Sequence, residues 1–355
     1  MYIYFLIMMA AFFLSGVLNK VYCKDTKFTN FGKFIINIFI FLILLLPMGL
    51  RYGIGTDYFY TYYPYFNFIG HGTRYFDEVG FNLLNIIVYK LFGRFEMLIF
   101  ITSFIFIYFM YKGILNNLNE KERPWGTLML FLSQAYFYSM NMVRQSLAIS
   151  IIFFAFKFLK SKEYKKYYMW NLIACTLHYS AIICLLFPLL FKIKPKKKTK
   201  LVIISILILC QPFLSKVLLK IIMSTKYSWY IGSRYTHGIS NTVILVNIVL
   251  FILSILYEDK NSTSEEYMIL NTINYICICL MLLLGWIPLF NRIIRYFTVF
   301  QVLLVPKIIY SETGSKKRLV LKCLLFLIFF VPMYYQIFLL GGEGVVPYSS
   351  IFNKS

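Results

Sequence analysis

Long apolar runs, separated by short polar segments rich in lysine and arginine, make up most of the chain. A helix needs about 17–25 mostly apolar residues to cross a bilayer, and most of these runs approach that length. The runs expected to cross are residues 2–19, 34–50, 97–111, 125–143, 145–159, 201–219, 241–257, 267–287, 296–310 and 319–340. The pattern predicts an all-α polytopic integral membrane protein, a single membrane domain over residues 1–355 with about 10–12 transmembrane helices.

Two further apolar segments do not fit simple crossings. Residues 81–92 are too short to span and contain Lys90, so we expect an interfacial helix there, within a long extracytoplasmic loop over residues 51–96. Residues 167–191 are long enough, but lysine clusters stand on both sides, and the positive-inside rule places both clusters in the cytoplasm. We therefore predict a re-entrant or broken helix at 167–191 that turns near His178.

The basic segments also predict the orientation of the chain. Positive charges follow the first apolar run, so its N-terminus is expected outside. The segments expected on the cytoplasmic side are 20–33, 112–124, 157–166, 192–200, 258–266 and 311–318. Those expected outside are 51–96, the turn near 141–144, 220–240, 288–295 and the C-terminal tail.

Composition agrees with a membrane protein and excludes most soluble classes. Hydrophobic residues make up 60% of the chain and charged residues only 14%, whereas a soluble domain has about 25% charged residues. The net charge of +22 sits mainly in loops, where basic residues set orientation and meet anionic membrane lipids. No basic stretch is interleaved with stacking aromatics, so nucleic acid is not an expected partner.

Motifs for cofactors and metals are absent from the sequence. There is no G-x-x-x-x-G-K-[ST], D-x-D or H-E-x-x-H, and the seven cysteines lie mostly in apolar runs without the spacing of a zinc site. We expect no cofactor and no metal, which disfavours a metal-dependent transferase that uses nucleotide sugars.

The candidate chemistry lies mainly on the expected outer side. Four of the arginines predicted there are the candidates, although outer loops should be poor in basic residues: Arg51, Arg144, Arg292 and Arg295. A single arginine at a helix end can simply extend its charge to the interface. Four of them predict a diphosphate site, because the guanidinium fork suits paired phosphate oxygens.

Acids, a histidine and tyrosines accompany these arginines. Asp57 and Glu78 lie in the 51–96 loop, where acids beside an apolar boundary are costly unless paired or used. Glu78 could alternatively favour the first turn of a helix at 81–92. His178 lies within an apolar run, where a satisfied core histidine is the alternative to a functional one. Tyr58 and Tyr62 could belong to an interfacial aromatic belt.

Five short motifs follow one another along the chain: Arg51-Tyr-Gly-Ile-Gly-Thr-Asp57, Glu78-x-Gly80-Phe81, Asn141-x-x-Arg144-Gln145, Leu177-His178-x-Ser180-Ala181 and Asn291-Arg292-x-x-Arg295. In this order and spacing they resemble the EpsG family of bacterial exopolysaccharide proteins, which are similar to Wzy-type O-antigen and capsule polymerases. The resemblance covers about residues 1–310. The last span and the Gly341-Gly342-Glu343 tail are expected to lie outside it.

The resemblance implies a metal-independent, lipid-linked glycosyltransferase in the bacterial inner (plasma) membrane. It would join undecaprenyl-diphosphate-linked oligosaccharide repeat units on the outer face, with flippase and chain-length regulator proteins as partners. The four arginines would bind diphosphate and offset the charge of the leaving group. Tyr58 and Tyr62 would stack against sugar faces. A general base would take the acceptor proton, and we expect Asp57 in this role ahead of His178 and Glu78.

Two other classes stay open. A lipid-linked oligosaccharide flippase or transporter should show internal repeats or charged residues near span centres, and His178 is the sole hint of either. A membrane acyltransferase that modifies the polysaccharide would need a histidine-based site fed from the cytosol, for which His178 is again the one candidate.

Overall fold

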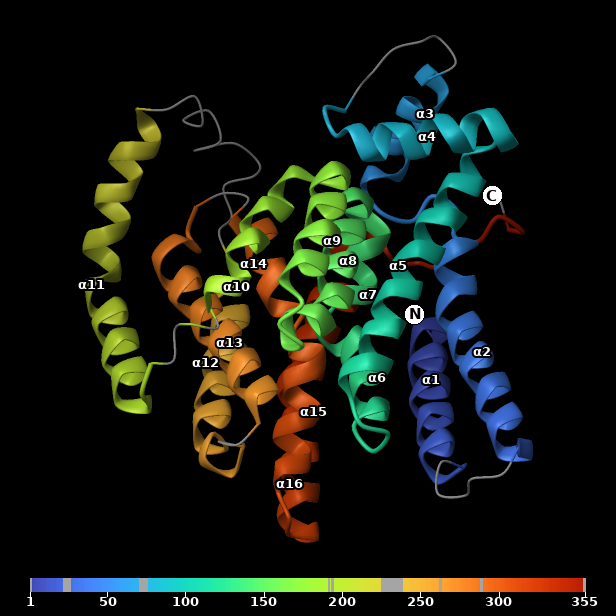
Figure 1. Ribbon diagram of the computed structural model, residues 1–355. Helices are drawn as coiled ribbons and strands as arrows, with labels where there is room; N and C mark the ends of the chain where they lie inside the picture. The colour runs from blue at the N-terminus through green and yellow to red at the C-terminus, as the bar shows by residue number, and fades with distance from the viewer. Residues whose placement is uncertain are drawn as a thin grey trace. The chain divides into compact units, whose positions relative to one another are not determined.

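The computed structural model describes residues 2–21, 27–69, 76–190, 192, 195–224, 239–261, 264–287 and 290–353 (Figure 1). Parts of several expected loops, including 70–75 and 225–238, lie outside the described residues. The described chain is built from α-helices with short 3-10 and π turns, and the β pairing among the described residues is an isolated antiparallel bridge between Arg51 and Ser350. The predicted all-α class is confirmed.

Five helices among the described residues can cross a membrane by length and composition: α2 (Lys27–Gly49), α5 (Phe95–Asn117), α11 (Lys197–Met223), α13 (Glu265–Leu284) and α16 (Ser315–Met333) with the π turn η5 (Tyr334–Leu339). A bent pair, α14 (Phe290–Thr298) with α15 (Gln301–Ser311), makes a sixth. The chain is therefore a multi-pass membrane protein.

This number is smaller than the predicted 10–12 because several expected spans fold as short, broken or more polar helices. The run 125–143 divides into α6 (Arg123–Leu132) and α7 (Ala135–Asn141), and Gln134 between them adopts a left-handed conformation (φ 64°). The run 145–159 becomes α8 (Val143–Lys160), which carries a charge at each end.

The described residues divide into two compact units, of which the first comprises Met1–Leu185 and Leu325–Ser355 and the second Leu186–Leu324. In the first unit, α8 is the central helix, and nearly all its side chains are buried between α5 and α9 (Tyr164–Leu177). Gly113 of α5 permits this packing, since a Cβ there would overlap the Phe153 ring of α8. Helices α2 and α6 pack against α5, and α1 (Tyr2–Val21) packs against α2 and α6.

Short helices cover one end of the first unit. The π turn η1 (Tyr58–Tyr62) leads into α3 (Tyr63–Ile69), and α4 (Val79–Phe92) lies crosswise at the end of α5 in Figure 1. Helix α4 contains the segment expected as an interfacial helix, and it exposes Val79, Leu83 and Leu91 on its outer side. The described residues of the 51–96 segment thus form a helical cap in which the candidate acids are placed.

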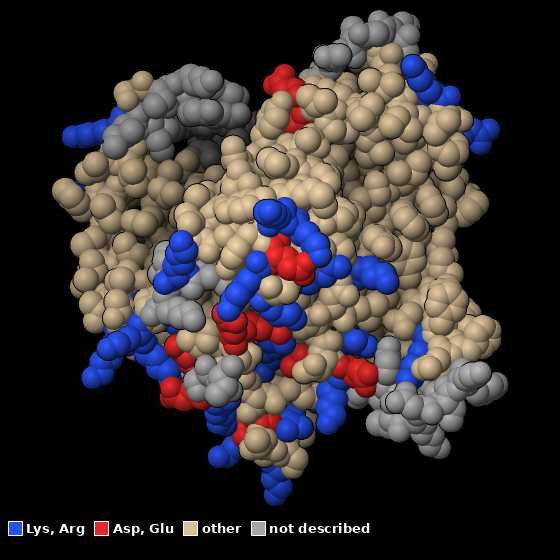
Figure 2. All heavy atoms as spheres, viewed as in Figure 1, with Lys and Arg blue, Asp and Glu red and all other residues tan. Residues whose placement is uncertain are grey.

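The second unit contains α10 (Phe187–Leu190), α11, α12 (Asn241–Leu256), α13, α14 and α15. Its apolar core joins α11, α12 and α13 through Ile204, Phe251 and Tyr275. At one end, Lys200 Nζ pairs with Glu258 Oε2 at 3.0 Å and Lys260 Nζ with Glu312 Oε2 at 2.8 Å. Figure 2 shows basic and acidic side chains intermixed at the lower ends of α12 and α13.

These ion pairs bring together three segments that are expected in the cytoplasm. Lys200 belongs to 192–200, Glu258 and Lys260 to 258–266, and Glu312 to 311–318. The predicted topology requires these three segments to lie at the same end of the unit.

Candidate active site

A buried carboxylate joins three elements of the first unit. Glu78 stands at the N-cap position of α4, yet its side chain makes no capping hydrogen bond. Its Oε2 instead accepts from Arg144 Nη1 of α8 at 2.6 Å, and its Oε1 lies 3.6 Å from His178 Nδ1 at the end of α9. The Glu78 side chain is 7% exposed, and a carboxylate so buried is costly unless it is paired. The structure therefore brings together three residues that the sequence singled out.

Arg144 occupies a position that helix stability does not explain. It is the second residue of α8, where a cation opposes the positive end of the helix dipole. Glu78 offsets this charge, and the guanidinium carbon lies 3.8 Å from the centre of the Phe76 ring, a cation–π contact. Its Nε is buried and has no hydrogen-bond partner in the described structure. An unpaired buried donor costs about 1–3 kcal/mol, which an anionic oxygen at this edge would remove.

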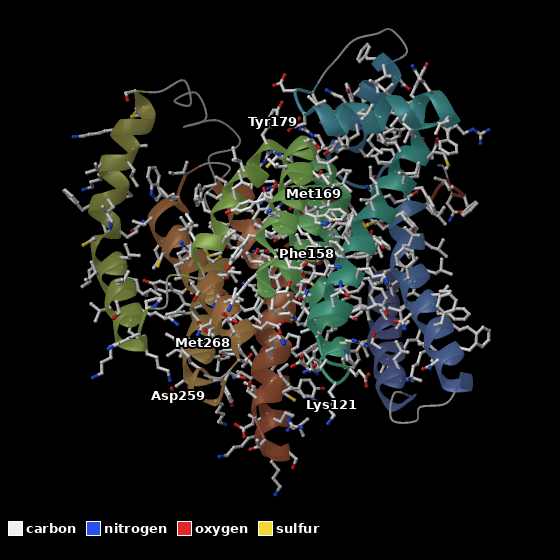
Figure 3. All side chains as sticks on the ribbon, in the orientation of Figure 1. Lys121, Phe158, Met169, Tyr179, Asp259 and Met268 are labelled. Carbon is white, nitrogen blue, oxygen red and sulfur yellow. The ribbon has the colours of Figure 1, made fainter. Side chains whose placement is uncertain are left out.

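His178 is presented by a break in the chain. Helix α9 ends at Leu177, His178 is extended (φ −157°, ψ 121°), and the 3-10 helix η2 (Tyr179–Leu186) follows. The hydroxyl of Tyr179, which is labelled in Figure 3, donates to the Asp77 carbonyl at 2.6 Å. This bond ties the residue before Glu78 to the residue after His178, and it holds the carboxylate and the imidazole at one end of α9.

Asp57 is held by the side chain of Asn141. Asn141 Oδ1 accepts from the Asp57 amide at 3.0 Å and from Thr56 Oγ1 at 2.9 Å. Gly55 makes this approach possible, since its φ is +98° and a Cβ there would lie 2.6 Å from the Met140 carbonyl oxygen. Asn141 ends α7, three residues before Arg144, so the Asp57 turn is fixed close to the start of α8.

Tyr62 lies near both charges. Burial raises the pKa of its phenol, Arg144 opposes that rise, and the Asp57 carboxylate adds to it. Tyr62 and Tyr58 are both buried against other aromatic rings, Tyr58 against Phe95 and Tyr62 against Phe81. The exposed rings of this segment are Phe59 and Tyr60, the latter at 88%.

Arg51 is buried inside the first unit and is only 1% exposed. Its guanidinium donates to the Met48 carbonyl at 2.6 Å, to Ser103 Oγ at 2.9 Å and to the Met140 carbonyl at 3.2 Å. It thereby joins the end of α2 to α5 and α7. Burial lowers the pKa of Arg51 to about 10, partly offset by nearby tyrosines.

Arg292 and Arg295 lie on α14 of the second unit, three residues apart and both half-buried. Among the described residues there is no group of three or more His, Cys, Asp and Glu side chains that could hold a metal ion. The four predicted arginines therefore occupy different environments. Arg51 is buried and joins three helices, Arg144 is paired with Glu78, and the other two belong to α14.

Sequence reasoning missed Phe76 and the C-terminal tail. Asn141 Nδ2 donates to Glu343 Oε2 at 2.7 Å, which connects the tail to the Asp57 turn. A single acid between glycines in Gly341-Gly342-Glu343-Gly344, on the expected outer side, was the signal that could have pointed to it.

In a comparison with known protein families, the matched region includes this tail. A family model described as the EpsG family matches residues 34–350, nearly the whole chain. No curated protein and no solved structure matches the chain. The expectation that the last span and the tail lie outside the resemblance was wrong, because both fall within the matched residues.

Proposed function

The chain belongs to the EpsG family, a Wzy-like polymerase family, and from that premise we propose that it is a polysaccharide polymerase. It joins undecaprenyl-diphosphate-linked oligosaccharide repeat units on the outer face of the bacterial inner membrane. The product is O-antigen, capsule or another exopolysaccharide. A flippase that delivers the units and a chain-length regulator are its proposed partners.

The observation that carries the proposal is the half-buried guanidinium of Arg144. Glu78 fixes one of its nitrogens, Phe76 covers a face, and Nε is left without a partner. A diphosphate oxygen is the kind of acceptor that this donor edge fits, through charge-assisted hydrogen bonds. The chemistry needs no metal in this proposal, because the arginine supplies the positive charge.

The proposed reaction is a glycosyl transfer. The acceptor hydroxyl oxygen forms a bond to the anomeric carbon of the donor, and the bond from that carbon to the diphosphate oxygen breaks. Undecaprenyl diphosphate leaves with the electron pair, and Arg144 stabilises the negative charge that develops on it. The acceptor proton passes to a general base. The roles of Arg292 and Arg295 in diphosphate binding rest on the family resemblance alone.

We keep Asp57 as the proposed base. Glu78 is buried and paired with Arg144, whereas Asp57 is half-buried on the outer loop. His178 is the competing candidate, because it lies beside Glu78 and a neutral imidazole can accept a proton. Substituting Asp57 and His178 one at a time tests which of them is the general base.

The length distribution of the surface polysaccharide in a strain that lacks the gene tests the proposal. We expect long polymer ladders to be replaced by single repeat units on the outer face. Accumulation of lipid-linked units on the inner face would instead identify a flippase, and ladders of normal length whose sugars lack acyl groups would identify an acyltransferase.

A further inference from the structure

The C-terminal segment 341–353 lies along the loop that carries Asp57. Three backbone hydrogen bonds of 2.9–3.0 Å join the two: Ile351 N to Leu50 O, Tyr52 N to Ser349 O and Gly55 N to Gly344 O. The bridge between Arg51 and Ser350 belongs to the same pairing. The loop between α2 and η1 therefore takes its backbone partners from the opposite end of the chain.

Side chains anchor the segment to the helices of the first unit. Val345 is fully buried, and its carbonyl accepts from the Tyr4 hydroxyl of α1 at 2.9 Å. The hydroxyl of Tyr348 donates to the Pro47 carbonyl of α2 at 3.0 Å. These contacts fix the segment against α1 and α2, so it is a packed part of the unit.

Asn141 is the link between this segment and Asp57. Its amide nitrogen donates to Glu343 Oε2, and its amide oxygen accepts from the Asp57 amide and from Thr56 Oγ1. Because one side-chain amide makes all three bonds, Glu343 determines which way the Asn141 oxygen points. Glu343 has a φ of 63°, a conformation that is unfavourable for a residue with a side chain and persists only where its surroundings hold it.

We propose that segment 341–353 is a latch that positions the Asp57 carboxylate, with Glu343 acting through Asn141 as its polar contact. Glu343 is a positioning residue and touches no substrate. The proposal deepens the proposed function, on which the role of Asp57 rests. A turn with two glycines would otherwise leave the Asp57 carboxylate free to move, and a misplacement of about 1 Å can cost about 100-fold in rate.

An exchange of the polar partners tests the latch. In Asn141→Asp the new carboxylate faces Glu343, and repulsion should displace the Asp57 turn. In Asn141→Asp with Glu343→Gln, the glutamine amide donates to the new aspartate, which still accepts from Asp57 and Thr56. Glu343→Gln alone keeps an acceptor for Asn141. Asn67→Asp, at an exposed position in α3, is the matched control for an added carboxylate in this region.

Two measurements are made on each full-length variant: polysaccharide length, and hydrogen–deuterium exchange of the 51–57 amides in nanodiscs. Asn141→Asp should cut chain growth about 10- to 100-fold and speed exchange, and the double variant should restore both. Glu343→Gln and Asn67→Asp should behave like the wild type. If Asn141→Asp does not accumulate as folded protein, Glu343→Ala, which removes only the acceptor, should speed exchange and shorten the polymer.

Three results would overturn the latch. One is normal exchange in both Asn141→Asp and Glu343→Ala. Another is faster exchange with unchanged chain growth, which would show that the loop needs no positioning. The third is a double variant that recovers neither property. Unchanged polymer after gene removal would contradict the proposed function instead, while the exchange data would still decide whether the tail holds the loop.

Discussion

The two units each contain a buried glutamate paired with a cation, but the pairs differ in how completely they are satisfied. In the second unit, Glu258 Oε2 accepts from Lys200 and from the Asn271 amide, and Asn271 Oδ1 in turn accepts from Ser254. In the first unit, Glu78 leaves Arg144 with an unpaired Nε and stands beside His178. A saturated network holds helices together, whereas an unsaturated one has donors left for a ligand.

The positions of the two cations support the same distinction. Lys200 lies in the first turn of α11 with its charge fully enclosed, at 1% exposure of its side chain. Arg144 keeps 22% of its side chain exposed, at the end of the unit where Asp57 and Tyr62 lie. Substitutions in the second-unit network should therefore change stability, and those around Arg144 should change activity.

The largest expected effect is on the general base. Asp57→Asn keeps the shape of the side chain and removes its basicity, so chain growth should fall about 100- to 10,000-fold while single lipid-linked units accumulate outside. Polysaccharide ladders measure this, and Asp77→Asn, at an exposed acid of the same loop, should leave them unchanged. Normal ladders in Asp57→Asn combined with their loss in His178→Ala would move the base to the histidine.

Breaking the saturated pair should cost stability instead. Lys200→Met leaves Glu258 buried without its cation, and the loss of one partner from a buried pair destabilises by about 3–5 kcal/mol. We expect lower protein levels and a lower melting temperature in detergent, with normal polymer length per molecule of protein. Lys198→Met, at an exposed position two residues earlier, should match the wild type. Shortened polymer at wild-type stability would contradict the assignment of this network to structure.

Arg144→Lys tests the unsaturated pair. Lysine keeps the positive charge for Glu78 but loses the planar fork and the Nε donor, so chain growth should fall about 10- to 100-fold with little change in protein level. Arg94→Lys, at an exposed position, controls for the substitution itself. Wild-type ladders from Arg144→Lys would show that charge alone suffices and that no bidentate contact is made.

Hydropathy predicted most of the helices, but it did not show how they divide. Gln134 interrupts an apolar run without a glycine or proline to signal it, so the boundary between α6 and α7 could not be predicted. Residue types singled out Glu78, Arg144 and His178. Their pairing could not be read from the sequence, because Glu78 and Arg144 are 66 residues apart.

The four arginines illustrate the same difference between residue type and environment. Arg51 and Arg144 both follow apolar runs near the expected outer boundary and are equivalent in composition and position along the chain. Only packing distinguishes Arg51, which is 1% exposed and donates to two carbonyls and a hydroxyl, from Arg144, which pairs with Glu78 and keeps 22% of its side chain exposed. The tail was missed for a similar reason, since its contacts with the Asp57 loop join opposite ends of the chain.

The smallest expected effect concerns pH and the second unit. Glu312 accepts from Lys260 and from the Gly314 amide, and these bonds lower its pKa from 4.5 to about 2. A carboxyl group whose pKa is lower in the folded state adds stability above about pH 4.5, and that stability is lost as the pH falls towards 2. Glu312→Gln should therefore lower the melting temperature at pH 7 by about 1–3 °C, because Lys260 is 46% exposed and water screens the pair. The difference from the wild type should shrink as the pH is lowered towards 3.

Glu120→Gln, in the first unit, controls for the loss of one carboxylate. A difference that stays constant over this pH range would mean that the Glu312 contacts stabilise the second unit through packing and not through charge.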